Sequence, residues 1–129
     1  MLYALINVKH NTITYSSAAS PDPIYGSILG TEICVGDGSG HLLGVFGSSK
    51  YENHQIDFPQ GSFIFLYSDA LHEAHHREEE FVGSERIISL VKKHRHTNAQ
   101  VALDGIISEF NSIARCPLSD DMTTVMLCR

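Results

Sequence analysis

The alternation of apolar and polar residues divides the chain into a β-rich first half and a helical second half. Alternating or short apolar runs, which are typical of half-buried and buried strands, occupy six stretches: 1–8, 12–18, 24–29, 32–35, 51–58 and 62–67. The polar residues 9–11 predict a hairpin between the first two runs, and Gly30 predicts another between the next two. The 51–58 run is polar enough for an edge strand, whereas the 62–67 run is apolar enough to be buried.

After Gly83 the apolar residues recur with the helical period. Ile87, Ile88 and Val91 would share one face of a helix that begins with Ser84 as its N-cap and ends near residue 93.

A second helix is predicted to follow. Thr97 and Gln100 have the spacing of a capping box, and apolar residues keep helical spacing until Pro117 stops the helix. Residues 122–128 then read as a final strand. The predicted fold class is therefore α+β, with a mostly antiparallel sheet, two C-terminal helices and a returning strand. The 129 residues fit a single domain over 1–129.

Charge and cysteine content narrow the functional classes. The net charge of −6 and the pI near 5.7 give no basic surface for nucleic acid. The one basic cluster, 92–96, is offset by the glutamates at 78–80, so we interpret it as a solvated helix end. The three cysteines are widely spaced and form no CxxC motif, which argues against a disulfide framework and against a thiolate zinc site.

Targeting and membrane signals are weak in this sequence. The apolar run 1–6 is too short for a signal peptide, and no run approaches the ~20 apolar residues of a membrane span. Free thiols fit a reducing compartment. We therefore expect a soluble, cytoplasmic protein with no membrane partner.

Carboxylates stand at the tips of two apolar strands. Asp69 follows the 62–67 run, and Asp120 and Asp121 precede the last strand. Each could merely cap a turn, but two acidic sites at the ends of buried strands are typical of proteins that bind Mg²⁺ or Mn²⁺. The pair indicates metal-dependent phosphate chemistry.

A glycine-rich segment, Gly-Asp-Gly-Ser-Gly-His at 36–41, has the order of residues found in some metal and phosphate sites. No lysine and no helix follow it to complete a phosphate cradle. We interpret it as a β-turn whose glycines supply positive φ angles.

The letters HEAHH, which begin at His72, fit the zinc-peptidase pattern H-E-x-x-H. On a helix, His72 and His76 would share one face and could bind zinc, with Glu73 as general base. A third ligand would have to come from a second helix, from Glu85 or Glu109. The segment has no apolar helical face, so a solvated helix or loop is the favoured interpretation.

Several motifs together resemble a known family. Residues 61–73 are similar to a motif that consists of Pro-Gly-Asp, an apolar run, Tyr-Thr-Asp-Gly and a glutamate a few residues later. Residues 81–87 resemble the Phe-Gly and Arg-Leu that follow this motif. Residues 120–123 resemble the closing Asp-Asp-x-Thr of the same pattern. Weaker similarities lie at 3–15, 17–23 and 43–45. The chain thus resembles the PPM metal-dependent serine/threonine phosphatases, in their bacterial sporulation-stage-II-E-like branch.

The resemblance implies a PPM-like α/β sandwich that hydrolyses phosphoserine or phosphothreonine. It implies two Mn²⁺ or Mg²⁺ ions that activate a water for attack on phosphorus. Asp69 and Asp120 match metal-binding aspartates of the family, and Asp121 is the neighbour of the latter. By the same resemblance, the partner would be a phosphorylated regulatory protein of the type that antagonises anti-sigma factors.

The chain departs from the family pattern in ways that affect this expectation. The early metal motif, which should precede the first hairpin, is missing; position 70 is Ala rather than Gly; and Ala19 and Ser20 alter the second segment. We therefore expect a partial domain with weak or absent turnover, or alternatively a non-catalytic interaction module. An incomplete sandwich should also expose apolar surface and self-associate.

Overall fold

The computed structural model describes residues 1–77 and 81–129, so the glutamates expected to offset the basic cluster lie outside the described residues. In chain order the elements are β1 (Leu2–Asn7), β2 (Thr12–Ser17), β3 (Ile24–Ser27), β4 (Ile33–Val35), β5 (His54–Asp57), β6 (Ser62–Tyr67), α1 (Gly83–His94), α2 (Ala99–Ile113) and β7 (Thr124–Cys128).

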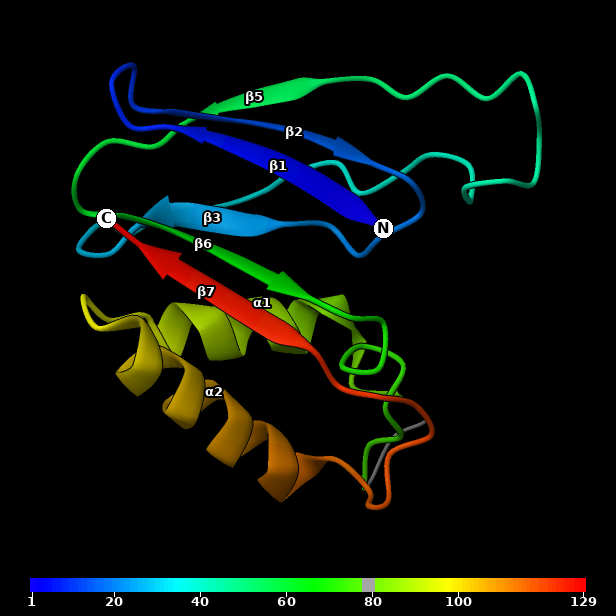
Figure 1. Ribbon diagram of the computed structural model, residues 1–129. Helices are drawn as coiled ribbons and strands as arrows, with labels where there is room; N and C mark the ends of the chain where they lie inside the picture. The colour runs from blue at the N-terminus through cyan, green and yellow to red at the C-terminus, as the bar shows by residue number, and fades with distance from the viewer. Residues whose placement is uncertain (78–80) are drawn as a thin grey trace.

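These elements form three layers (Figure 1). One antiparallel sheet has the order β1-β2-β5, and a second has the order β4-β3-β6-β7. The two sheets stack, and both helices cover the other face of the second sheet. The α+β class, the final strand and the two C-terminal helices are confirmed. Within the described residues, no helix has the length and apolarity needed to span a bilayer.

Local chemistry forms the first hairpin as predicted. The Asn7 Oδ1 accepts hydrogen bonds from the backbone N–H groups of Lys9 (3.2 Å) and His10 (3.1 Å), and Asn11 closes the turn with φ of 56°. The strand that follows has the expected period of two, because every second residue of β2 is buried.

The apolar run 62–67 forms β6, an inner strand of the second sheet. It pairs with β3 on one side and with β7 on the other. All of its residues except Leu66 are buried. The polar strand β5 lies at the edge of the first sheet, also as predicted.

Both helices form where the spacing predicts them, but both predicted caps are wrong. Helix α1 begins at Gly83, whose φ is 76°, and its N-cap position is Val82, which has no side-chain capping hydrogen bond, rather than Ser84. Helix α2 is capped by Asn98, whose side chain accepts from the N–H groups of Gln100 and Val101, rather than by Thr97.

Two hydrophobic cores result from this layering. The larger core lies between the second sheet and the helices, and Phe63, Phe65, Ile106 and Phe110 are fully buried in it. The smaller core lies between the two sheets and consists of Ile13, Tyr15, Ile56, Phe58 and Ile64.

Candidate functional site

The two segments that contain the predicted acidic positions meet where β6 ends and β7 begins. Ser68 joins them: its backbone N–H donates to the Thr123 carbonyl (2.9 Å), and its hydroxyl donates to the Asp121 carbonyl (3.1 Å). The same hydroxyl accepts from the Thr123 N–H (3.0 Å). Asp69 therefore follows a serine that is fixed to the segment containing Asp121.

Asp69 opens a tight turn. Its Oδ1 accepts from the Ala70 N–H (3.0 Å), and its carbonyl accepts from the Glu73 N–H (3.0 Å). The carboxylate is exposed to solvent, which leaves lone pairs for a cation. Asp120 and Asp121 are also exposed, and the Asp120 Oδ1 accepts from the Asp121 N–H (2.7 Å).

A cleft of about 490 Å³ lies beside this turn. Its lining comes from two crossover segments between the sheets, 19–22 and 38–40, and from Tyr67, Asp69, His72, Glu73 and Ser84. Asp69 thus faces the cleft, whereas Asp120 and Asp121 do not line it. Among residues 1–77 and 81–129, no three His, Cys, Asp or Glu side chains come close enough to hold a metal ion.

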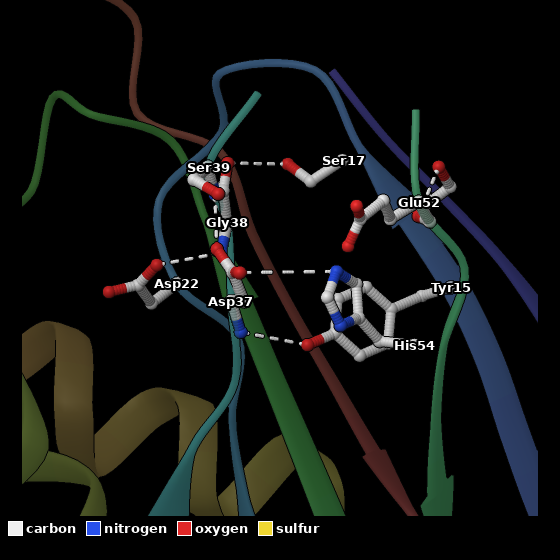
Figure 2. A network of polar contacts seen from close by, with 9 residues as sticks. Tyr15, Ser17, Asp22, Asp37, Gly38, Ser39, Glu52 and His54 are labelled. Atoms are coloured by element: carbon white, nitrogen blue, oxygen red, sulfur yellow. Dashed lines mark hydrogen bonds and ion pairs between the residues drawn. The ribbon is translucent and has the colours of Figure 1, made fainter. Parts of the chain in front are cut away.

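Asp22 is a cleft carboxylate that the sequence analysis did not single out. Its Oδ1 accepts from the Gly38 N–H (2.7 Å), so it binds one crossover segment to the other (Figure 2). The signal in the sequence was the pair of prolines that flank it, which restrict the backbone on both sides.

The prediction of a β-turn at 36–41 is wrong for residues 36–39, and of its three glycines only Gly40 has the expected positive φ (125°). Residues 36–39 run extended beside the 17–23 segment: the Gly36 N–H donates to the Pro23 carbonyl (2.8 Å), and the Gly38 carbonyl accepts from the Ser20 N–H (3.0 Å). A Cβ on Gly38 would lie 2.1 Å from the Ser20 carbonyl oxygen. Close approach of two backbones, rather than positive φ, explains this glycine.

A network of polar contacts joins residues 36–39 to strands β2 and β5 (Figure 2). The Asp37 N–H donates to the Tyr15 hydroxyl (2.8 Å), and the Asp37 carboxylate lies 4.0 Å from the His54 Nε2. The His54 ring stacks on Tyr15 with 5.2 Å between ring centroids. Hydrogen bonds from Ser39 to the Asp37 carboxylate, and to a smaller degree the charge of His54, hold the Asp37 pKa below its usual value.

Tyr67 supplies a neutral hydroxyl to the cleft. Burial raises the pKa of Tyr67 above its ordinary value, and the negative charge of Asp22 acts in the same direction, while a hydrogen bond with Ser84 opposes them. The phenol therefore remains protonated at neutral pH.

The H-E-x-x-H segment does not form the helix that a zinc peptidase requires. His72 lies in a turn, and His76 forms an isolated antiparallel bridge with Ala114. Two further hydrogen bonds hold this pairing: the Arg115 N–H donates to the His75 carbonyl (2.8 Å), and the Arg77 N–H donates to the Ile113 carbonyl (3.1 Å). The two histidines do not share a helical face, so the zinc-peptidase alternative is wrong.

Comparison with known sequences assigns the family. The whole chain, residues 1–129, matches the family described as Stage II sporulation protein E (SpoIIE). The chain belongs to the SpoIIE family. No protein in the curated set matches the chain.

Solved structures agree with a SpoIIE-like fold of the PPM type. The chain is similar to the SiaA-PP2C domain of Pseudomonas aeruginosa, with a TM-score of 0.83 and 15% identity over 99% of this chain and 50% of that one. It is also similar to the phosphatase domain of SpoIIE from Bacillus subtilis, with a TM-score of 0.76 and 15% identity over 99% of this chain and 55% of that one. The structure of RsbX in complex with magnesium is similar with a TM-score of 0.62 and 23% identity, over 94% of this chain and 51% of that one.

The chain therefore spans about half the length of these structures. At such low identities the likeness establishes the fold alone: the chain has a PP2C-like architecture.

Proposed function

We propose that the chain supplies part of the metal centre of a SpoIIE-type protein phosphatase that acts on phosphoserine or phosphothreonine of a regulatory partner protein. The observation that carries the proposal is that Ser68, the residue before Asp69, is bonded to the backbone of Asp121 and Thr123, so that the two acidic segments lie side by side and Asp69 lines the cleft. By the resemblance in sequence, Asp69 and Asp120 match metal-binding aspartates of the family, and Asp121 is the neighbour of Asp120.

The donor chemistry suits a hard cation, but the ligand set is incomplete. Carboxylate oxygens are the ligands that Mg²⁺ and Mn²⁺ prefer, and one similar structure was determined with magnesium and another after presoaking with Mn. In the part of the chain that the structure describes, however, no three candidate ligands lie together. The residues present do not make a complete two-metal site.

The proposed roles of the chain's own residues follow from their contacts. Asp69 faces the cleft and would bind the cation, with Asp120 and Asp121 contributing from the neighbouring segment. Asp22 keeps the opposite wall in place through Gly38. The neutral Tyr67 hydroxyl can donate a hydrogen bond within the cleft.

The experiment is phosphate release from a phosphoserine protein and from an aryl phosphate, with Mn²⁺ compared with EDTA, alongside Mn²⁺ binding by calorimetry. Asp69→Asn is the test variant, and Asp57→Asn is the matched control because Asp57 is an exposed aspartate on β5. We expect Mn²⁺ binding that Asp69→Asn abolishes and Asp57→Asn preserves, with little or no turnover by this chain alone.

The same experiment tests a second candidate function, a non-catalytic interaction module, which the incomplete ligand set favours. A folded chain that neither binds Mn²⁺ nor releases phosphate would favour this module. Turnover that requires Mn²⁺ and is lost in Asp69→Asn would favour catalysis.

A further inference from the structure

His72 lies at the junction of two cavities. The cleft of about 490 Å³ and a second cavity of about 520 Å³ share three lining residues, which are His72, Glu73 and Ser84. The second cavity is also lined by His75 and Phe81, whose rings stack with 5.3 Å between their centroids. A ligand that extends from the cleft into the second cavity would therefore pass His72.

Contacts within this chain fix the position of the His72 ring. The ring meets the Tyr67 ring edge-on, with 6.2 Å between centroids and an interplanar angle of 85°. The His72 carbonyl accepts a hydrogen bond from the Gly83 N–H (2.9 Å). Strand β6 and the start of α1 therefore hold the ring in place beside the cleft.

The two ring nitrogens of His72 have different surroundings. Nδ1 is fully buried and has no hydrogen-bond partner within residues 1–77 and 81–129. The side chain is nevertheless 29% exposed, so solvent reaches the part of the ring away from Nδ1. On that side Nε2 lies 3.7 Å from the carboxylate of Glu73, which is itself exposed.

These surroundings assign the ring proton to Nε2. A proton on Nδ1 would be a buried donor without an acceptor, which folded proteins rarely contain. A proton on Nε2 faces solvent and a nearby negative charge instead. Because 3.7 Å is too long for a hydrogen bond, Glu73 does not take up this donor. The His72 Nε2–H is thus available to a ligand.

The same assignment makes His72 a poor metal ligand. A histidine that binds a metal through Nε2 carries its proton on Nδ1 and almost always donates it to an acceptor, and in the described part of the chain Nδ1 of His72 has none. The carboxylates that line the cleft, Asp22, Asp69 and Glu73, can only accept hydrogen bonds when ionised. His72 therefore complements them, because it offers a donor to an acceptor oxygen.

We propose that the His72 Nε2–H binds a phosphoryl oxygen of the phosphoserine or phosphothreonine substrate, with the flanking peptide in the second cavity. The identity of this ligand rests on the proposed function, which puts a phosphate ester beside Asp69. A hydrogen bond to an anionic oxygen is stronger than one between neutral groups, and a ring that is already held in place loses little freedom on binding. His72 would therefore favour phosphorylated over unphosphorylated peptide.

NMR of the ring nitrogens in the isotope-labelled chain tests the donor directly. At about pH 7.5, where histidine side chains are ordinarily neutral, we expect the His72 proton on Nε2. A peptide of alanines with one central phosphoserine, added with Mg²⁺, should shift the Nε2 signal, whereas the unphosphorylated peptide should not. A proton on Nδ1, or an Nε2 signal that ignores the phosphopeptide, would overturn the proposal. This measurement needs no variant, so it does not depend on how a variant folds.

Substitutions of His72 measure the strength of the contact. His72→Leu removes the donor and should raise the dissociation constant of the phosphopeptide about tenfold. His72→Gln keeps an N–H donor and should raise it about threefold or less. His10→Leu is the matched control, because His10 is an exposed histidine in the first hairpin, and melting temperatures show whether each variant is folded. If His72→Leu weakens the phosphorylated and unphosphorylated peptides equally, His72 contacts the peptide rather than the phosphoryl group, and the proposal is wrong.

Cation binding separates this proposal from the proposed function. Calorimetry should give the same Mn²⁺ affinity for His72→Leu and the wild type, and a loss in the variant would make His72 a metal ligand and overturn the proposal. A chain that binds the phosphopeptide through His72 but binds no Mn²⁺ would contradict the proposed metal centre and support the role of His72. A chain that binds Mn²⁺ but not the phosphopeptide would support the metal centre and refute the role of His72.

Discussion

The two hydrophobic cores differ in how completely the fold closes them. The core between the helices and the second sheet contains fully buried side chains from both layers, such as Phe65 on β6 and Phe110 on α2. The core between the sheets is smaller, and partly buried residues such as Leu2 and Ala4 lie along its rim. One sheet is therefore covered on both faces, whereas the other presents its outer face to solvent.

The candidate site lies where these two regions meet. Asp69 extends from β6, the strand that both cores hold in place. Asp22 and Gly38 belong to crossover segments between the sheets, and polar contacts rather than burial fix them to each other. The cleft thus has one wall held by packing and one held by hydrogen bonds, and the following experiments compare them.

Matched truncations in the two cores should give the largest effect. Ile106 and Ile13 are both 0% exposed, one in each core. We expect Ile106→Ala to lower the free energy of unfolding by about 3–4 kcal/mol and Ile13→Ala by about 2–3 kcal/mol, because the open rim of the smaller core allows more relaxation into the cavity. Urea denaturation followed by circular dichroism measures both. A larger loss for Ile13→Ala would contradict the contrast between the cores.

A glycine substitution tests the wall held by hydrogen bonds. In Gly38→Ala the new Cβ would lie 2.1 Å from the Ser20 carbonyl oxygen and 2.8 Å from the Pro21 carbonyl carbon, so the two crossover segments must separate. We expect a loss of about 1–3 kcal/mol. Gly47→Ala is the control because nothing lies within 4 Å of its added Cβ. Equal melting temperatures for the two variants would show that the segments separate at no cost.

Two substitutions of Asp22 separate the contribution of its hydrogen bond from the contribution of its negative charge on the same wall of the cleft. Asp22→Ala removes the acceptor for the Gly38 N–H and should cost about 1–2 kcal/mol, whereas Asp22→Asn keeps an acceptor oxygen and should cost less than half of that. Both variants remove a carboxylate from the cleft, so both should weaken Mn²⁺ binding. If Asp22→Asn destabilises the fold as much as Asp22→Ala, the charge rather than the hydrogen bond holds the wall.

The spacing of apolar residues predicted the strands and helices correctly because the pattern within each element reflects which of its faces is buried. The alternation along β2 and the apolar run of β6 are read directly from neighbouring residues. Acidic residues at strand tips could be located in the same way, since antiparallel pairing of β6 with β7 brings Asp69 towards the 120–123 segment.

The wrong predictions for the 36–41 and 72–76 segments share a dependence on distant partners. The extended course of residues 36–39 depends on pairing with 17–23, and the non-helical course of 75–77 depends on pairing with 113–115. A local motif, whether glycine-rich or H-E-x-x-H, carries no information about such a partner. Asp22 was missed for the same reason, because its acceptor role involves a glycine 16 residues away.

The smallest effect is expected at the surface of the well-closed region. The Glu109 carboxylate on α2 contacts the Lys93 Nζ at 2.7 Å and the His94 Nε2 at 2.6 Å, both at the end of α1. Hydrogen bonds from Lys93, and then from His94, hold the Glu109 pKa below its ordinary value of 4.5. A carboxyl whose pKa falls on folding contributes stability above its unfolded pKa and loses it as the pH falls through its folded pKa.

Glu109→Gln should therefore produce a small decrease in melting temperature at pH 7, and this difference from the wild type should close as the pH falls below 4.5. Because the side chain is 32% exposed, solvent screens the pair, and the effect should be smaller than that of any core truncation. Thermal melts from pH 7 to pH 3 measure it. If the melting temperatures of Glu109→Gln and the wild type still differ at low pH, Glu109 holds the two helices together by side-chain packing. The exposed side of the larger core would then depend on packing contacts rather than on charge.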